Sequence, residues 1–365
     1  MGGKKSFFFL IRAGKNRFFL IRAGFVAAVL FNFSLFVSKR QRIIFVFFLP
    51  FSFSLRDNRD FAEMYSTHQR KTEWHYEMDR TKLQLKNVEY EEFKKFCKEL
   101  MVDETLMELE IISYNFGASY AKLLGNALKK NTKLEILKLN SLRLGNDGTK
   151  FIMNALQVNT VVRVVTLSWN YIGPKGAKAI ADCLKVNKMI SILDLSSNDI
   201  GEEGIMFIAK ALTINDSLVT LNISRNELAD NGIKDLSYRL KDNKRLENLD
   251  ISQNEIEVDG AKSIARLLLF NTVLLSLDIS GNEIEDVGAE MIAKALITNI
   301  KTGLVKISVA DNNFGDDGVK AFAETMKRNT TLTFVNMAGN TMTDEGAIAI
   351  AGALQINEIL DTLDI

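Results

Sequence analysis

The sequence predicts an α/β solenoid, a long stack of short units that each contain one strand and one helix. Two observations support this prediction. Asparagines recur at one fixed interval through much of the chain, and each follows an alternating apolar pattern and precedes apolar residues at helical spacing. A unit as short as this interval cannot enclose a core of its own, so neighbouring copies must bury their apolar sides against one another.

The repeat has a regular series of asparagines with one longer step near its end. The members are Asn170, Asn198, Asn226, Asn254 and Asn282 at intervals of 28, Asn312 after 30 more, and Asn340 after a further 28. Stepping back from Asn170 by the same interval reaches Leu142 and Tyr114, where the asparagine is absent but the surrounding pattern persists. The series predicts nine such units over residues 106–365, and a partial tenth at residues 360–365.

Each unit divides into a strand half and a helix half. In residues 190–198, ISILDLSSN, apolar and polar residues alternate, which is typical of a strand with one buried face. Ile205, Ile208 and Leu212 follow at helical spacing, with Lys210 on the outer side. A second asparagine, such as Asn215, ends each helix, and we expect it to adopt the left-handed conformation of a helix C-cap.

These motifs resemble a known repeat. Residues 246–254, LENLDISQN, and residues 288–296, GAEMIAKAL, are similar to the ribonuclease-inhibitor type of leucine-rich repeat, and the resemblance covers residues 106–365. It implies a leucine-rich-repeat solenoid shaped as a horseshoe, with parallel strands on the concave face and helices on the convex face. The repeat regions of NOD-like receptors and Ran GTPase activators show the same resemblance, so it specifies the fold more closely than the function.

Residues that flank the buried leucines of each strand are expected to point into the horseshoe. Four positions before the strand asparagine, the candidates for a binding site are Asp194, Asn222, Asp250 and Asp278; one position before it, they are Trp169, Arg225 and Gln253. Tryptophan and arginine dominate the energetics of protein interfaces, which favours a contact site at the concave face. The alternative is that Trp169 packs locally over a neighbouring strand.

The chain offers no pattern for catalysis, and we expect no catalytic residue, no cofactor and no metal site. No phosphate-binding loop, dinucleotide-binding motif or zinc-ligand cluster is present. Both histidines, His68 and His75, precede the repeats, so no histidine is available there to activate a serine. The two cysteines, Cys97 and Cys183, form no disulfide framework, which favours a cytoplasmic location.

Charge divides the chain into two parts. Residues 1–56 contain ten basic residues and no acidic one, whereas residues 57–365 hold 36 basic and 45 acidic residues, a net charge of −9. Nucleic acid is therefore not expected as a partner of the repeats, because phosphate binding requires concentrated positive charge. Acids such as Asp286 and Asp316 gather before the helices. They indicate either a rim for a basic partner or calcium, or compensation of the helix dipoles, which we favour.

Residues 1–56 form a basic, Phe-rich hydrophobic leader with 14 of the 24 phenylalanines. The heptapeptide at residues 8–14, FFLIRAG, recurs at residues 18–24. Three interpretations stay open: a membrane-associated segment, a cleaved targeting peptide, or a wrongly extended gene model. Membrane contact is expected only through this segment. Residues 57–105 are interpreted as a linker followed by an N-terminal cap unit, with a strand at residues 83–88 and a helix at residues 90–100.

At the other end, the partial tenth unit has no helix. We expect residues 361–365 to form an unpaired sheet edge, with Leu354 and Leu363 poorly covered, unless a partner or a second copy covers them.

Together these features predict a cytoplasmic protein-binding scaffold or adaptor that uses its concave face on a protein partner of unknown identity. The alternatives are a GTPase-activating protein of the Ran type, a repeat fragment of a NOD-like receptor, or a ciliary protein.

Overall fold

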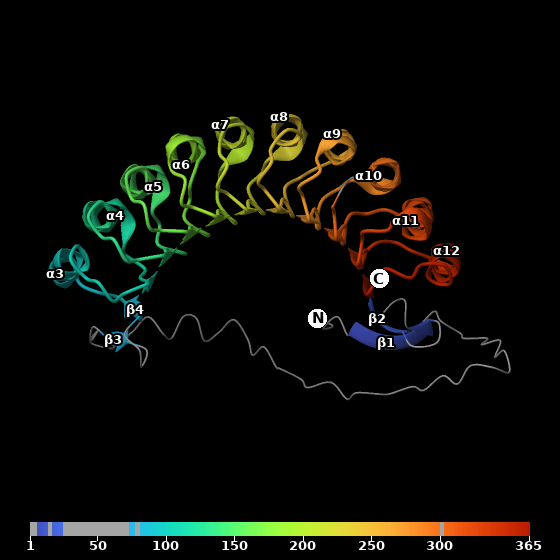
Figure 1. Cartoon of the computed structure of the whole chain (residues 1–365), viewed down its shortest axis with the longest axis horizontal. Helices are drawn as coiled ribbons and strands as arrows, with labels where there is room; N and C mark the ends of the chain where they lie inside the picture. Colours follow the sequence, from blue (N-terminus) through green and yellow to red (C-terminus); the bar gives the residue numbers. More distant parts are fainter. Residues whose placement is uncertain (1–5, 14–16, 25–72, 77–80, 300–302) are drawn as a thin grey trace.

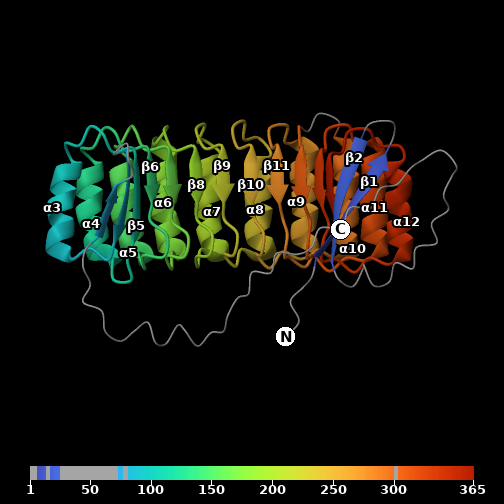
Figure 2. The same ribbon diagram turned by 90° about the horizontal axis from the view of Figure 1, so that it is seen from below.

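The structure is a computed structural model of the chain, and it describes residues 6–13, 17–24, 73–76, 81–299 and 303–365. Strands and helices alternate along an arch, with the strands on its inner side and the helices on its outer side (Figure 1). Seen from below the arch, the strands lie side by side with the helices behind them (Figure 2). The α/β horseshoe predicted from the sequence is confirmed.

The strands of the arch form one parallel sheet in which each strand pairs with the next along the chain. They are β4 (Lys82–Lys86), β5 (Glu108–Ile112), β6 (Ile136–Lys138), β7 (Val164–Thr166), β8 (Ile192–Asp194), β9 (Thr220–Asn222), β10 (Asn248–Asp250), β11 (Ser276–Asp278), β12 (Lys306–Ser308), β13 (Phe334–Asn336) and β14 (Thr362–Asp364). The register matches equivalent residues of successive units, so that Leu249 lies opposite Leu221 and Leu277. The sequence period therefore becomes a set of columns that run along the arch.

A helix follows each strand from β5 to β13, and one more belongs to the N-terminal cap. The helices are α3 (Tyr90–Leu100), α4 (Gly117–Leu128), α5 (Gly145–Leu156), α6 (Pro174–Val186), α7 (Gly201–Leu212), α8 (Ala229–Leu240), α9 (Val258–Phe270), α10 (Glu285–Thr298), α11 (Asp316–Arg328) and α12 (Asp344–Leu354). The strand and helix expected in the cap correspond to β4 and α3. None of the helices in the described part of the chain has the length and apolar composition of a membrane span.

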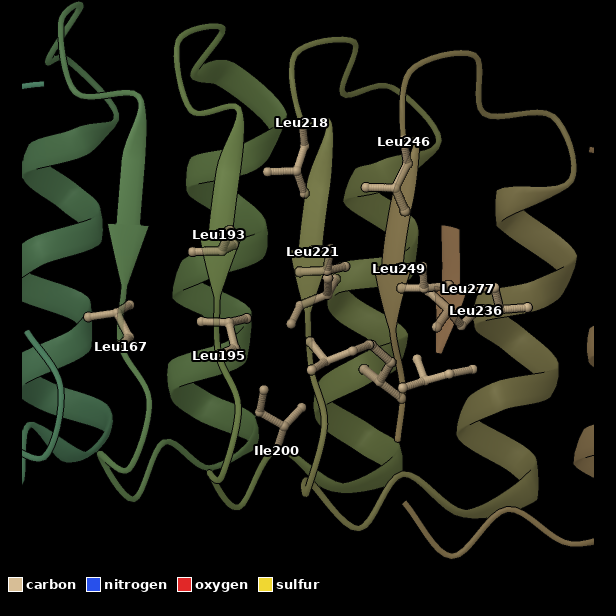
Figure 3. Packing of buried hydrophobic residues seen from close by; sticks show 14 of the residues in the cluster. Leu167, Leu193, Leu195, Ile200, Leu218, Leu221, Leu236, Leu246, Leu249 and Leu277 are labelled. Carbon is tan, nitrogen blue, oxygen red and sulfur yellow. The ribbon is translucent and has the colours of Figure 1, made fainter. Parts of the chain in front are cut away.

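The core runs as one continuous apolar layer between the strands and the helices. Each unit contributes strand leucines such as Leu193 and Leu221 and helix residues such as Leu236, all of them buried. Figure 3 shows these side chains filling the space between neighbouring units. No unit has a core of its own, which is the physical reason for the stack.

Asparagines satisfy the backbone between units. The Asn254 amide donates from Nδ2 to the carbonyl oxygen of Ile223 at 3.0 Å and accepts at Oδ1 from the backbone N–H of Asn226 at 2.8 Å. Both partners belong to the preceding unit, and Asn254 itself is fully buried. One buried amide therefore joins two units at each step, as buried polar groups require.

The expected left-handed conformation of the helix-ending asparagines is wrong. Asn187 has φ −72° and ψ 129°, and Asn271 has φ −73° and ψ 136°, both of them extended. The reason is a side-chain role: Asn187 Oδ1 accepts from the N–H groups of Met189 and Ile190, while its Nδ2 donates to the carbonyl oxygen of Leu156. The asparagine is needed for these bonds and not for its tolerance of positive φ.

The ends of the sheet carry additional strands. At the N-terminal end, β3 (Glu73–Tyr76) pairs antiparallel with β4. At the other end, β14 pairs in parallel with β2 (Arg17–Gly24), which pairs antiparallel with β1 (Ser6–Ala13) (Figure 1). The expected unpaired edge is therefore wrong, since the repeated heptapeptide supplies two strands.

The poor covering expected for the last core layer is also wrong. Leu354 is 7% exposed and Leu363 is fully buried. Residues 25–72 lie outside the described residues, so the three interpretations of residues 1–56 stay predictions. The longer step between Asn282 and Asn312 includes residues 300–302, which also lie outside the described residues.

Candidate functional site

The strand residues between the buried leucines form a polar row on the concave face. Asp194 on β8 pairs with Asn222 on β9, Asn222 pairs with Asp250 on β10, and Asp250 pairs with Asp278 on β11. The structure thus brings four of the predicted site residues together, and we call them the carboxylate row. Their columns follow from the alternation along each strand, which buries Leu249 and turns Asp250 outward.

Hydrogen bonds within each strand end hold these side chains in place. Asp194, Asp250 and Asp278 each accept at Oδ1 from the backbone N–H two residues later, at 2.9 Å, 3.0 Å and 2.9 Å. Asn222 accepts from the N–H of Ser224 in the same way, at 2.9 Å. The row is therefore ordered before any partner arrives, which lowers the entropic cost of binding.

The row carries negative charge without local compensation. Within residues 81–299 and 303–365, none of its three carboxylates lies within ion-pair distance of a lysine or arginine. Burial raises the pKa of Asp250; the hydrogen bonds from Ser252 act against this, and the negative charges of Asp278 and Asp194 raise it further. The negative charge of ionised Asp250 therefore destabilises the folded state.

Trp169, Arg225 and Gln253 each lie three residues after the end of a strand (β7, β9 and β10), along the rim of the concave face. Their backbones have φ of 58°, 56° and 54°, in the left-handed region. Trp169 is 58% exposed, and its N–H donates to the carbonyl oxygen of Ser196 at 3.1 Å, which joins the rim to the strand of Asp194. Arg225 is held by its neighbour, because its Nε donates to Gln253 Oε1.

Tyr171, which lies two residues after Trp169, was not among the site residues predicted from the sequence. Tyr171 has φ 56° and is 64% exposed, and the buried Asn170 separates the two aromatic residues. Large side chains rarely adopt positive φ, so the local backbone gives no reason for two aromatics here. Reading the position after the strand asparagine as a column would have revealed Tyr171 beside Arg143 of the preceding unit.

Asp286 and Asp316, which lie in the first turns of α10 and α11, have a structural role. Asp286 Oδ1 accepts from the N–H groups of Gly315 and Gly318, both at 2.8 Å. In the next unit, Asp316 Oδ1 accepts from Thr343 and Gly346. Asp286 and Asp316 thus cap the helices of the following units, α11 and α12, and for these two acids this supports the helix-dipole interpretation over a binding rim.

The described residues show little capacity for covalent chemistry. Burial raises the pKa of both the Cys97 and the Cys183 thiol to about 12, so both stay protonated and unreactive at neutral pH. Among these residues, no group of three or more His, Cys, Asp or Glu side chains is placed to hold a metal ion.

Comparison with known proteins agrees with the repeat. The Leucine Rich repeat family model matches seven segments, at residues 158–181, 186–209, 215–237, 242–265, 270–293, 303–323 and 328–351. No curated protein matches the chain.

Solved structures with some likeness include three repeat proteins. The second actin-binding site of leiomodin-1 is 23% identical with a TM-score of 0.33, and the match covers 49% of this chain and 87% of that one. The tropomodulin C-terminal domain of Caenorhabditis elegans is 14% identical with a TM-score of 0.36, covering 41% and 90%. An internalin from Listeria monocytogenes is 16% identical with a TM-score of 0.39, covering 78% and 86%.

Proposed function

The chain belongs to the leucine-rich-repeat proteins, and from that premise we propose that it is a protein-binding scaffold or adaptor whose concave face holds the partner. The observation that carries the proposal is that the carboxylate row, uncompensated within the described residues, and the exposed Trp169 at the rim belong to the same concave face. Neither feature is needed by the fold.

Neutral residues of the same column show that the fold does not need the charges of the carboxylate row. Asn222 and Asn336 occupy the same column and accept the same hydrogen bond from the N–H two residues later. An amide therefore satisfies the strand end as well as a carboxylate does. Asp250 adds a charge that burial and two like neighbours disfavour, and such perturbed groups are frequent at functional sites.

Residues at the equivalent position of other units likewise show that the fold does not need the Trp169 side chain. Ser197 and Gly281 adopt the same left-handed conformation at the equivalent position, with φ of 55° and 67°. The turn thus accepts small residues, and the indole is not required to close it. Tryptophan is among the residue types enriched at the hot spots of protein interfaces, so the exposed indole is a candidate anchor.

The remaining parts of the proposal concern the cellular compartment and whether the protein is an enzyme. The buried free thiols of Cys97 and Cys183 are compatible with a reducing compartment, and we propose the cytoplasm. We propose a non-enzymatic role, since the described part of the chain offers contact surfaces and no activated nucleophile. Stimulation of GTP hydrolysis by the full chain would instead support the Ran-type alternative.

The experiment is a comparative affinity purification with mass spectrometry. The full chain is compared with Trp169→Ala/Arg225→Ala and with a matched control, Tyr238→Ala/Lys210→Ala, which removes an exposed aromatic and a base from the outer helices. Partners should be lost from the concave variant and retained by the control. Equal recovery by both folded variants would contradict the concave face as the binding site.

A further inference from the structure

We infer that the partner segment held by the concave face is an amphipathic α-helix with a basic face, lying along the arch across β7 to β11. The inference deepens the proposed function and rests on it. It commits to a protein segment of defined spacing and charge, and both properties follow from the carboxylate row and Trp169.

The spacing of the columns matches that of a helix. Neighbouring strands lie about 4.8 Å apart, so the members of the row on β8, β9, β10 and β11 stand at steps of about 4.8 Å along the arch. A helix rises about 1.5 Å per residue, so residues i, i+3, i+7 and i+10 advance by about 4.5, 10.5 and 15 Å and share one face. These positions face Asp194, Asn222, Asp250 and Asp278 in turn.

An extended segment fits this row less well. Side chains on one face of a strand repeat at about 6.6–6.8 Å, which falls out of step with a row of about 4.8 Å after one residue. The width of the face also suits a helix. The strands β7 to β11 are each three residues long, or about 10 Å, close to the diameter of about 10–12 Å of a helix with its side chains.

Charge determines which residues the helix presents. Bases at i, i+7 and i+10 would face the carboxylates of Asp194, Asp250 and Asp278. At i+3 the row holds the neutral Asn222 on β9, three residues before the cationic Arg225, so a neutral polar residue fits there. One turn before i, the helix reaches β7. Trp169 follows three residues after the end of this strand, and an apolar side chain of the partner helix would pack on its exposed indole.

Toward the N-terminal end, the charge of the row ends at Asp194, because the next residue of the column is the uncharged Thr166 on β7. On β6, the side chain at the equivalent position is Lys138, which donates to Glu108 at 2.5 Å and is thereby paired within the chain. Beyond β11 the column continues with the buried Ser308. The cationic face of the partner helix is thus limited to the length of the carboxylate row, and its apolar end lies toward β7.

The test uses a designed peptide and the full chain. The probe is a fluorescent alanine-rich helix of about 18 residues, with leucine at i−4, lysine at i, i+7 and i+10, and glutamine at i+3. A control peptide of the same composition spreads the lysines around the helix. Binding by fluorescence anisotropy should be saturable for the probe, weaker by about tenfold or more for the control peptide, and weakened by salt.

Two variants of the chain test whether binding of the probe depends on the charges of the carboxylate row or only on the total negative charge of the chain. Asp194→Asn/Asp250→Asn/Asp278→Asn keeps the hydrogen bonds that Asn222 shows to be possible and should weaken probe binding about tenfold or more. The control, Asp147→Asn/Glu203→Gln/Glu290→Gln, neutralises three exposed carboxylates of the outer helices and should bind as the unaltered chain does. Circular dichroism verifies that both variants are folded.

Three results would overturn the inference: no saturable binding of the probe up to about 1 mM, equal binding of both peptides, or no effect of the triple Asn change. Cellular partners distinguish this failure from that of the proposed function. If partners are lost with Trp169→Ala/Arg225→Ala but kept by the triple Asn variant, the concave site stands and the basic helix is wrong. If neither variant loses partners, the proposed function itself fails.

Discussion

At the scale of the residue, the concave face shows how a repeat separates what the fold needs from what it does not. Leu249 is buried, as stacking requires, whereas Asp250 beside it carries a charge that the strand end does not need. The same contrast applies at the rim, where Ser197 and Trp169 share one backbone conformation. Residues that depart from the common requirement of their column are the best candidates for function.

Replacing Asp250 with Asn should stabilise the chain at neutral pH. The raised pKa means that the folded state holds the proton more tightly, so the ionised carboxylate opposes folding above that pKa. The advantage of Asp250→Asn should shrink as the pH falls through the folded pKa and disappear below the ordinary value of 3.8. Thermal unfolding of both proteins at several pH values measures it. A variant less stable than the unaltered chain at pH 7 would contradict the burial argument.

Trp169 provides a test of binding that does not depend on stability. Trp169→Asn removes the indole and places a residue that tolerates φ of 58° in the turn, so folding should be unaffected or improved. Affinity for the partner should fall by about 2 kcal/mol or more if the indole anchors the interface. Calorimetric titration with a captured partner measures the change, with Ser197→Asn as the control for the substitution in an equivalent turn. Unchanged affinity would remove Trp169 from the site.

At the scale of the element, helices α6, α9, α11 and α12 each receive a side-chain acceptor from the unit before them. Helix α11 begins after Gly315 without a side-chain cap from its own unit, and Asp286 of the preceding unit supplies the missing acceptor. The pKa of Asp316, which caps α12 in the same way, is held below its usual value by hydrogen bonds from Thr343. The stability that the Asp316 carboxylate contributes is present at pH values above its pKa in the unfolded chain. It is lost as the pH falls through the lower pKa of the folded state.

Removing one inter-unit cap should therefore destabilise the stack locally. Asp286→Ala leaves the N–H groups of Gly315 and Gly318 without their acceptor and should cost about 1–2 kcal/mol of unfolding free energy. Asp286→Asn keeps an acceptor, as Asn146 does toward Gly173 and Gly176, and should cost less. Denaturant unfolding compares them, with Glu283→Ala as the control for an exposed acid nearby. Equal losses of unfolding free energy in Asp286→Ala and Glu283→Ala would show that the cap contributes no stability.

At the scale of the whole molecule, stability comes from contacts between neighbouring units. Leu249→Ala, in the middle of the arch, should cost about 2–5 kcal/mol, because its side chain is 2% exposed and lies in the continuous core. Lys210→Ala, on the outer face of α7, should cost under about 0.5 kcal/mol. Urea unfolding of the two variants measures the difference. Similar losses at the two positions would mean that Leu249 does not face the core.

The two ends of the sequence lie together at one end of the sheet. The pairing of β14 with β2 brings residues 362–364 beside residues 20–22, from opposite ends of the sequence. The last strand of the repeats thus has a neighbour on both sides, and the leucines beneath it are covered.

The sequence by itself determined the horseshoe, because its information is periodic. Apolar alternation before each asparagine and helical spacing after it specify a strand and a helix in every unit, and equivalent units can only stack in parallel register. The columns of the concave face follow from the same period, so Asp194, Asn222, Asp250 and Asp278 could be predicted to lie in one row before any coordinates were known.

Only the tertiary structure decided what those residues contact. The bond between Arg225 and Gln253, the cap that Asp286 gives to α11 and the extended backbone of Asn187 all depend on groups in neighbouring units or on side-chain direction. The exposure of Trp169 and Tyr171 likewise depends on how the turns of neighbouring units lie. A period in the sequence states which positions are equivalent, but the distances between side chains in adjacent turns, and the cover that β2 gives to β14, are set only when the units have packed.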